Sequence, residues 1–341
     1  MLRLPPFKFR LPTALSEAAD MLATEDSARV VAGGTDLWPN MKRRHQHAET
    51  VISLMRIPGL GEITNGSGDL TLGATASLHD VATHAAVLDG YPALARAIDS
   101  ISSPPLRHMG TIGGNVCVDT RCTYYNQTED WRRSIDYCLK EAGTTCWVAP
   151  GSKKCLAHSA SDSAPMLCAL GARVRIQSAA GEREIPLSAL YENDGIAYLT
   201  KQPDEIVTAI VVPQAARADG CRTAYWKLRR RGSIDFAVLS SSVALWVDAS
   251  GAVTDARIYL GAVSSQPLLA EAASQFLVGK TLEPETLREA AELARKPATP
   301  FDNTDFQAQW RGQMVVRYTE AALFEAAGLE VERLAPKHGI L

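Results

Sequence analysis

The sequence is poor in the features that mark membrane proteins and nucleic-acid-binding proteins. Its 341 residues include 35 Lys and Arg against 38 Asp and Glu, and the net charge of −3 leaves no basic field for nucleic acid. No stretch approaches the ~20 apolar residues that cross a bilayer. The first residues, MLRLPPFKFRLPT, lack the uninterrupted apolar segment of a secretory signal. We therefore expect a cytoplasmic protein that binds neither nucleic acid nor a membrane.

Disulfides and a catalytic constellation are not expected either. The seven cysteines are an odd number, and the cytosol keeps thiols reduced. The histidines His79, His84, His108 and His158 are scattered, and no acid–base pair or nucleophile constellation is evident, so we expect no catalytic residue in this chain. Three cysteines fit small apolar positions in the core: Cys117, Cys168 and Cys221.

Helical and strand patterns are mixed without a strict alternation, which predicts an α+β fold with at least two domains. Helix 15–22 is expected to begin at a Thr13 cap, and helix 77–87 at a Ser77 cap paired with Asp80. Residues 163–178 predict a helix that Gly171 ends, followed by a strand. Further helices are expected at 285–294 and 310–328. Strands are expected in the apolar runs 29–34, 50–54, 70–74, 205–213 and 236–263, the last holding two strands, and a domain boundary near 178–185.

Two glycine-rich turns, AGGTDL (32–37) and MGTIGGNVC (109–117), follow apolar segments. Paired glycines let successive backbone N–H groups converge into a concave anion site, although a plain tight turn is the alternative. Thr35, Thr111 and Asn115 add hydroxyl and amide groups that can bond phosphate or ribityl oxygens. Neither turn has the Rossmann or P-loop spacing. The pair of turns therefore predicts a dinucleotide of unspecified kind.

Five motifs occur in a familiar order: RVVAGGTDL, RHMGTIGGN, SDSAPMLCALGA, YWKLRRRGSIDFAV and ARIYLGAVSSQPLLA. From about residue 5 to 328 the chain resembles the FAD-binding subunit of the xanthine dehydrogenase superfamily of molybdenum hydroxylases. The resemblance implies an FAD-binding, PCMH-type domain at 1–180 with an inserted loop at 116–160. It also implies a C-terminal domain of the CO dehydrogenase flavoprotein type at 181–341.

The same resemblance implies which residues contact FAD. Three of these residues also have a purely structural alternative. Asp162 could cap the helix that begins at Ser163, Ile206 could be a core residue of its strand, and Lys227 could be a solvated strand residue. Ser163 departs from the leucine that relatives often carry there. The diphosphate would be wrapped by Arg29, Val30, Val31, Ala32, Gly33, Gly34, Thr35 and Asp36. The rest of the cofactor would be contacted by Ile101, Ser102, Thr111, Gly114, Asn115, Asp162, Ile206 and Lys227.

Four of the seven cysteines fall within 34 residues, beginning at TRCTYYNQ (120–127). Their spacing, C-x15-C-x7-C-x8-C, lacks the C-x2-C pairs of common zinc sites and the ferredoxin run. Soft thiolates suit Zn²⁺ and iron–sulfur clusters alike. The spacing therefore predicts a four-thiolate metal site and leaves iron–sulfur, zinc and unligated cysteines open.

The insertion CVDTRCTYYNQTEDWRRSIDYCLKEAGTTC resembles that of the β subunits of 4-hydroxybenzoyl-CoA reductases, which carry an extra [4Fe–4S] cluster. This resemblance implies Cys122, Cys138, Cys146 and Cys155 as the cluster ligands. Neighbouring polar groups would tune the reduction potential, and metal–thiolate bonds would supply folding energy on the order of 10 kcal/mol. The neighbours implied are Thr120, Arg121, Tyr124, Asn126 and Gln127.

The two resemblances imply an electron-transfer subunit that receives electrons from a ferredoxin-like donor. Partner subunits would hold two [2Fe–2S] clusters and the molybdenum cofactor, in a heterotrimer that dimerises, and would remove the phenolic hydroxyl of a 4-hydroxybenzoyl thioester. Two alternatives stay open. One is the flavin subunit of an aldehyde-oxidising molybdenum hydroxylase, and the other is a stand-alone flavin- or zinc-binding regulatory module.

Overall fold

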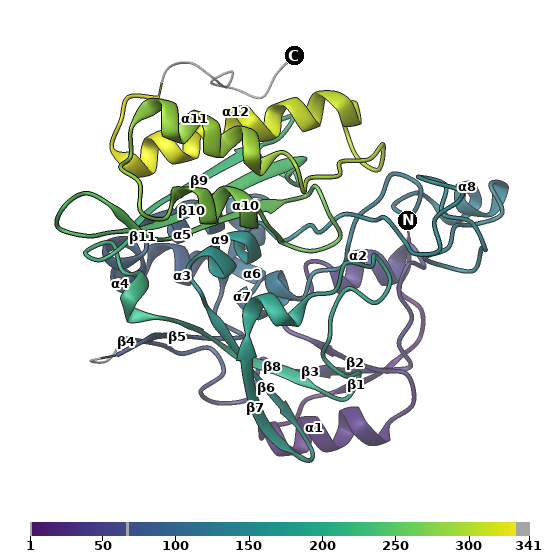
Figure 1. Cartoon of the computed structure of the whole chain (residues 1–341). Helices are drawn as coiled ribbons and strands as arrows, with labels where there is room; N and C mark the ends of the chain where they lie inside the picture. The colour runs from purple at the N-terminus through teal and green to yellow at the C-terminus, as the bar shows by residue number, and fades with distance from the viewer. Residues whose placement is uncertain (1, 66–67, 332–341) are drawn as a thin grey trace.

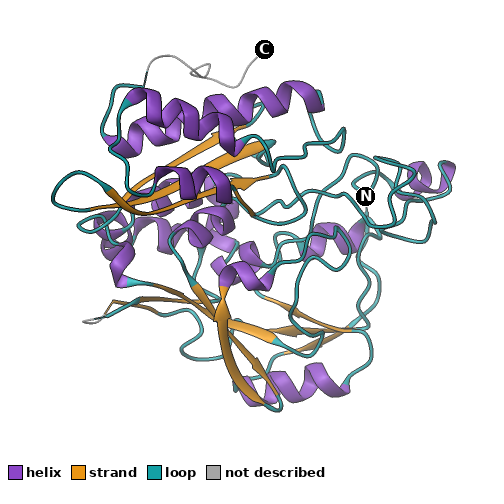
Figure 2. Cartoon of the chain, viewed as in Figure 1, coloured by secondary structure: helices purple, strands orange, loops and turns teal. Residues whose placement is uncertain are grey.

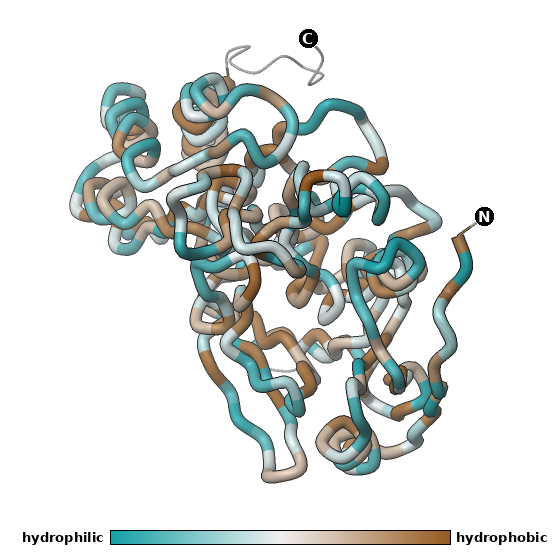
Figure 3. The backbone as a smooth tube through the Cα atoms, turned by 90° about the vertical axis from the view of Figure 1, so that its right-hand side faces the viewer, coloured by the Kyte–Doolittle hydropathy of each residue, from teal (hydrophilic) through white to brown (hydrophobic). Residues whose placement is uncertain are grey.

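The computed structural model describes residues 2–65 and 68–331. Within these residues, helices are combined with three separate sheets (Figure 1), which confirms the predicted α+β class. Hydrophobic residues gather on the segments in the middle of the molecule, and hydrophilic residues predominate in the outer loops (Figure 3). Among the described residues, no helix is both long enough and apolar enough to cross a membrane.

The first sheet is small and parallel, with strand order β1-β3-β2. Val30 of β2 pairs with Ile52 of β3, and α1 covers the sheet with Ala18, Ala19 and Leu22. The strand ends at Val31, where the first glycine turn begins and leads into α2. These elements are β1 (Lys8–Arg10), α1 (Leu15–Thr24), β2 (Ala28–Val31), α2 (Leu37–Lys42) and β3 (Thr50–Ser53).

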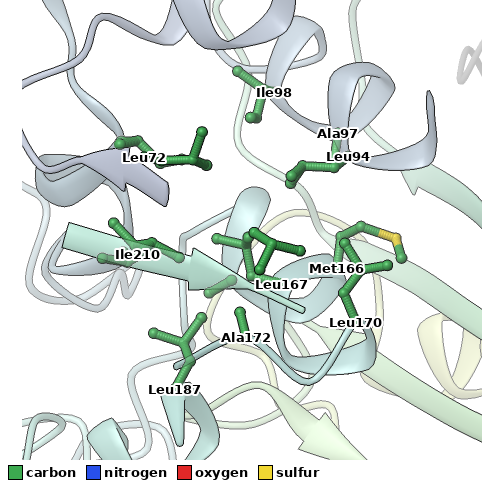
Figure 4. Packing of buried hydrophobic residues seen from close by; sticks show 14 of the residues in the cluster. Leu72, Leu94, Ala97, Ile98, Met166, Leu167, Leu170, Ala172, Leu187 and Ile210 are labelled. Atoms are coloured by element: carbon green, nitrogen blue, oxygen red, sulfur yellow. The ribbon is translucent and has the colours of Figure 1, made fainter. Parts of the chain in front are cut away.

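The second sheet is antiparallel, with strand order β4-β5-β8-β6-β7. Its apolar face packs on helices, and Figure 4 shows Leu72 and Ile210 from the sheet with Leu94, Ile98 and Leu167 from α5 and α9. The strands are β4 (Ile63–Asn65), β5 (Leu70–Gly73), β6 (Arg173–Ser178), β7 (Gly181–Pro186) and β8 (Ile206–Val212). The helices are α3 (Leu78–Thr83), α4 (Ala85–Gly90), α5 (Pro92–Asp99), α6 (Pro104–Met109), α7 (Ile112–Val116) and α9 (Ser163–Ala169).

The third sheet, in the order β12-β11-β10-β9, lies between two layers of helices (Figure 1). Side chains alternate across it: Val243 and Leu245 of β10 join the core under α10–α12, whereas Ala244 joins the core shared with α5 and α9. The strands are β9 (Arg222–Leu228), β10 (Leu239–Val247), β11 (Val253–Gly261) and β12 (Leu268–Leu269). The helices are α10 (Glu271–Leu277), α11 (Pro284–Ala294) and α12 (Ala308–Ala327).

The predicted strands and most of the predicted helices are confirmed, with two corrections. Helix 77–87 is wrong as one element, because His84 adopts an extended conformation (ψ 131°) and its ring nitrogen accepts from Ala86 N–H, which starts α4. Thr13 is not the cap of α1; Ala14 holds that position without a side-chain bond. The Ser77 cap is confirmed, with its hydroxyl accepting from Asp80 N–H at 3.0 Å. Gly171 has the expected left-handed conformation (φ +73°).

The predicted domain boundary near 178–185 coincides with the turn of the β6–β7 hairpin and most of β7. The following strand β8 pairs with both β5 and β6. Residues on either side of position 180 therefore share one sheet.

Residues 116–160, which we call the cysteine segment, are mostly loops around α8 (Glu129–Ser134) and project beside α2 (Figures 1 and 2). The buried Arg132 organises them, since its guanidinium donates to Glu129 at 2.7 Å, to the carbonyl of Arg43 at 2.8 Å, and to Glu141. Asn303, in the loop before α12, makes two hydrogen bonds to the cysteine segment. Its side-chain amide donates to Leu156 O at 2.6 Å, and its backbone carbonyl accepts from Thr123 N–H at 2.8 Å.

Candidate functional site

The two glycine turns lie against each other. A Cβ atom placed on Gly33 would lie 1.5 Å from the carbonyl oxygen of Met109, so only glycine permits this approach of the two backbones. Gly34 has φ +70°, and a Cβ there would lie 2.0 Å from the indole nitrogen of Trp38. In the described chain, the backbone N–H groups of residues 33–36 donate to no protein acceptor. The first turn therefore presents free donors of the kind that bind a diphosphate.

The residues before this turn have a different role. Arg29, Val30 and Val31 belong to β2 and are paired with β3, and Val31 O accepts from Leu54 N–H at 2.9 Å. Arg29 uses its side chain to donate to His47 O at 2.9 Å. Of the residues 29–36 predicted to bind the diphosphate, residues 33–36 are the ones whose backbone N–H groups are free to bind an anion.

The second turn is held by internal hydrogen bonds. Thr111 caps α7, and its hydroxyl accepts from Gly114 N–H at 3.2 Å. The Asn115 side-chain oxygen accepts from the hydroxyls of Ser161, at 2.9 Å, and Ser163, at 2.6 Å. This contact explains how Ser163 fits where the resemblance led us to expect leucine: its fully buried hydroxyl is satisfied by Asn115.

Asp162 and Lys227 form a buried ion pair at 2.8 Å, and each side chain is 4% exposed. Tyr225 donates to the same carboxylate at 3.1 Å, and the Lys227 ammonium also donates to the carbonyls of Ser100, at 3.0 Å, and Asp235, at 3.1 Å. Burial raises the pKa of Asp162, and the Lys227 charge opposes that rise. The alternatives given above for these two residues are not observed, since Asp162 makes no side-chain cap and Lys227 is not solvated.

The remaining predicted contacts divide into two places. Ile101 is 8% exposed, and Ser102, with φ +48°, accepts at its carbonyl from Ile234 N–H at 2.8 Å. Both residues therefore lie beside the loop between β9 and β10, which also holds Asp235, a contact of Lys227. Ile206 is 1% exposed and packs in the core with Ala18 of α1, which is the strand-core alternative.

The four clustered cysteines surround one pocket, which we call the cysteine pocket. Each is buried, with exposures of 7% for Cys122 and Cys138, 4% for Cys146 and 5% for Cys155. Within residues 2–65 and 68–331, no three His, Cys, Asp or Glu side chains form a group that could hold a single metal ion. The other lining residues are Tyr124, Tyr125, Leu139, Lys140, Trp147, Val148 and Ala157.

The protein backbone supplies hydrogen bonds to the thiols. Ala157 N–H donates to the Cys155 sulfur at 3.4 Å. Burial raises the pKa of Cys155 to about 12 and that of Cys122 to about 11, and nearby backbone N–H groups oppose both rises. Close packing also shapes the pocket, because a Cβ on Gly195 would lie 2.6 Å from the Cys155 sulfur. The Cys122 and Cys155 thiols therefore stay protonated at neutral pH unless a metal replaces their protons.

Arg121 links the cysteine segment to the first glycine turn. Its backbone pairs with His158 in both directions (2.9 and 2.8 Å), its side chain forms an ion pair with Asp36, and its guanidinium lies 4.7 Å from the ring centre of Phe236. The sequence predicted Arg121 only as a neighbour of the metal ligands. Its pairing with Asp36, 85 residues away, left no signal in the local sequence.

The other predicted neighbours of the cysteines have these positions. Tyr124 lines the cysteine pocket, and Thr120 donates to Gly195 O at 2.6 Å. The Asn126 side chain accepts from Cys122 N–H at 2.9 Å, whereas Gln127 donates to Thr123 O at 2.9 Å. Sequence reasoning missed Lys140, which lines the pocket, and the signal that could have found it is its position two residues after Cys138.

Comparison with known proteins identifies the family. A family described as "FAD binding domain in molybdopterin dehydrogenase" matches residues 5–215, more than half of the chain, and "CO dehydrogenase flavoprotein C-terminal domain" matches residues 223–326. The chain therefore belongs to the FAD-binding medium subunits of the xanthine dehydrogenase and molybdenum hydroxylase family. It is an oxidoreductase subunit, and the predicted family, fold and flavin are confirmed.

Individual relatives match along most of their length. The carbon monoxide dehydrogenase medium chain of Hydrogenophaga pseudoflava is 27% identical over 323 residues, or 93% of this chain and 97% of that one. The aldehyde oxidoreductase FAD-binding subunit PaoB of Escherichia coli (strain K12) is 30% identical over 286 residues, or 78% and 84%. A solved structure of the carbon monoxide dehydrogenase from Hydrogenophaga pseudoflava has a TM-score of 0.79 at 26% identity and covers 96% of this chain and 99% of its own.

Proposed function

We propose that this chain carries a [4Fe–4S] cluster in addition to FAD and is the electron-transfer subunit of a multi-subunit molybdenum enzyme. The observation that carries the proposal is the cysteine pocket, in which four buried thiols from one inserted segment face a common space. The Arg121–Asp36 ion pair joins that segment to the first glycine turn, where we place the FAD diphosphate. Two redox groups in one chain need such proximity in order to exchange electrons.

The donor chemistry of the cysteine pocket suits an iron–sulfur cubane. Each iron of a [4Fe–4S] cluster takes one thiolate, so the four ligands surround a space and do not converge on one point. The four cysteines that line the cysteine pocket suit that requirement. The N–H group of Ala157 directed at the Cys155 sulfur supports the assignment further, because hydrogen bonds to ligand sulfurs are a main control of cluster potential.

The first glycine turn suits the FAD diphosphate. The backbone N–H groups of residues 33–36 would donate to phosphate oxygens, and Thr35 offers a hydroxyl as a further donor. We propose Thr111, Gly114 and Asn115, with Ile101 and Ser102, as the residues of the second turn and its neighbouring loop that contact the rest of the cofactor. Asp162 and Lys227 would hold this region together, since their pair joins the helix after the cysteine segment to β9.

When bound, the flavin and the cluster supply the redox chemistry, and the polypeptide binds and orients them. Backbone N–H groups would hold the phosphates, and thiolates would hold the irons. Aromatic and apolar side chains, including Tyr125, Leu139 and Val148, line the cysteine pocket and would limit the access of water. No residue of this chain is proposed to act on the organic substrate.

We propose that partner subunits hold the molybdenum cofactor and two [2Fe–2S] clusters, in a heterotrimer that dimerises. The support is that relatives along nearly the whole chain are named as medium chains or medium subunits, such as the medium subunit of nicotine 6-hydroxylase from Paenarthrobacter nicotinovorans. The substrate chemistry would take place in the molybdenum subunit.

For the substrate we propose a 4-hydroxybenzoyl thioester, reduced to the benzoyl thioester with electrons from a ferredoxin-like donor. The support is the resemblance of TRCTYYNQ and the cysteine spacing to the insertion of 4-hydroxybenzoyl-CoA reductases. A second candidate is about as well supported. The 30% identity to the FAD-binding subunit of an aldehyde oxidoreductase favours aldehyde oxidation, with electrons leaving through the flavin.

The decisive experiment is anaerobic purification of the chain with its accompanying subunits, followed by iron, zinc, flavin and molybdenum analysis. We expect about four irons and one FAD in the isolated chain. Fewer than about three irons with FAD present would reject the cluster, and zinc in a colourless chain without partners would support a regulatory module. Assays of the complex with 4-hydroxybenzoyl-CoA plus reduced ferredoxin, and with aromatic aldehydes plus an acceptor dye, separate the two substrate candidates.

A further inference from the structure

Lys140 is a charged residue in the wall of the cysteine pocket that the FAD-binding function does not use. It follows Cys138 by two positions, lines the pocket, and has a side chain that is 6% exposed. A buried ammonium is costly unless its N–H groups are satisfied. The placement of this charge beside four thiols therefore calls for a reason.

The structure holds the Lys140 ammonium in one position. It donates to the Asp119 carboxylate at 2.6 Å, to Gly195 O at 2.7 Å, and to the Thr120 hydroxyl. The nitrogen also lies 5.0 Å from the ring centre of Tyr125 and 5.5 Å from that of Tyr198. The Thr120 carbonyl oxygen also accepts, at 3.3 Å. These acceptors satisfy the three donors of the ammonium, and the aromatic faces stabilise its charge.

The charge acts on the cysteine pocket from one side. Lys140 and Tyr125 are among the lining residues of the pocket, and Asp119 is not among them within the described chain. Gly195 joins Lys140 to a ligand cysteine: its carbonyl oxygen accepts from the Lys140 ammonium at 2.7 Å, and its N–H donates to Cys155 O at 2.9 Å. The ammonium is therefore held beside the wall of the pocket that carries Cys155. The other buried cations of the segment are directed elsewhere, Arg132 to Glu129 and Glu141, and Arg121 to Asp36.

We propose that Lys140 is a positioning residue that raises the reduction potential of the cluster held by the four cysteines, an inference that rests on the proposed function. A cubane with four thiolates becomes more negative by one charge when it accepts one electron from a low-potential donor. No bond forms or breaks in this step. A fixed positive charge in a poorly solvated site stabilises the reduced form more than the oxidised form. The cluster is thereby easier to reduce.

The test is an EPR-monitored redox titration of the purified, iron-loaded chain with dithionite as the reductant. Lys140→Met removes the charge and keeps the apolar stem, and we expect the equilibrium constant for reduction to fall at least tenfold, which is about 59 mV for one electron. Lys140→Arg should restore most of the wild-type potential. The matched control is Lys154→Met, because Lys154 also lies near a ligand cysteine but is exposed and donates to Asn193 O.

A Lys140→Met chain that binds full iron and titrates at the wild-type potential overturns the proposal. If that variant loses its iron, Asp119→Asn decides, since removal of the counter-charge should move the potential upward. An unchanged or lower potential in an iron-loaded Asp119→Asn chain is then the overturning result. Iron analysis of the wild-type chain comes first. Absence of a four-iron cluster there rejects the proposed function, an outcome distinct from a failure of the role of Lys140.

Discussion

Arg121, the residue immediately before Cys122, forms an ion pair with Asp36 in the first glycine turn. The Arg121 side chain is 14% exposed, and its Nε atom is buried without a hydrogen-bond partner. The Asp36 carboxylate is therefore the main partner of the Arg121 charge. Burial raises the pKa of Asp36, and the Arg121 charge opposes that rise. One arginine therefore connects the strand-end turn that suits a diphosphate with the segment that carries the four clustered cysteines.

Arg121→Gln should weaken FAD binding about tenfold, or about 1.4 kcal/mol. Without the arginine, the Asp36 carboxylate remains unpaired beside a binding site for an anion, which disfavours the diphosphate. Calorimetric titration of the apo-flavin chain with FAD measures the change. The double variant Arg121→Gln with Asp36→Asn should recover part of the loss, because the repulsive charge is gone. An FAD affinity equal to that of the wild-type chain contradicts the prediction.

Cys138→Ser should remove the iron and the brown absorbance while FAD stays bound at about one per chain. The hydroxyl is a poor replacement for a thiolate ligand, and the residues of the two glycine turns that we expect to contact FAD all precede residue 116. Arg121 should keep its position in this variant, since its backbone is paired with His158 rather than with a cysteine. Faster hydrogen exchange should be confined to residues 116–160.

The matched control for that variant is Cys221→Ser, because Cys221 is equally buried but does not line the cysteine pocket. It should keep both cofactors. Parallel loss of iron and FAD in Cys138→Ser would show that the two sites do not form independently.

Gly33→Ala should abolish FAD binding and lower the melting temperature. The added methyl group would overlap Met109 O, at 1.5 Å, so one of the two glycine turns has to move. Overpacking of this kind costs typically 1–3 kcal/mol. Gly151→Ala is the control, because nothing lies within 4 Å of the Cβ that it would add. Thermal unfolding and flavin fluorescence measure both variants, and a Gly33→Ala chain with wild-type FAD affinity contradicts the role of the turn.

Local sequence patterns predicted the elements that depend on local chemistry. The Ser77 cap and the left-handed Gly171 were predictable, since a cap and a helix-ending glycine act on their own neighbours. The break at His84 was not predicted because a histidine ring nitrogen replaced the usual capping hydroxyl. Contacts between distant positions, such as Asn303 with Leu156 and Lys140 with Gly195, leave no periodic signal. They depend on how the domains pack.

The stability of the protein should fall as the pH is lowered from 6.5 toward 3, and His158 should contribute part of this loss. His158 is 2% exposed, and its Nδ1 lies 2.9 Å from Ser159 O. Burial lowers its pKa to about 3, and the charges of Arg311 and Arg121 act in the same direction. In the unfolded chain the histidine titrates near its usual value, ~6.5. Between these two pKa values the unfolded state binds a proton that the folded state does not. The stabilising contribution of the neutral His158 is therefore complete above about pH 6.5 and is lost as the pH falls.

The expected slope from this one histidine is about 1.4 kcal/mol of unfolding free energy per pH unit within that window. Urea unfolding at pH 7.0, 6.0 and 5.5 measures it. His158→Gln cannot take up the proton, so it should be less stable than the wild-type chain at pH 7 but should lose less stability on acidification. His45, whose pKa burial lowers to about 4, adds a slope of the same sign, so the double variant with His45→Gln should have a flatter profile still. A His158→Gln chain whose stability falls as steeply as that of the wild type would show that this histidine is protonated in the folded protein.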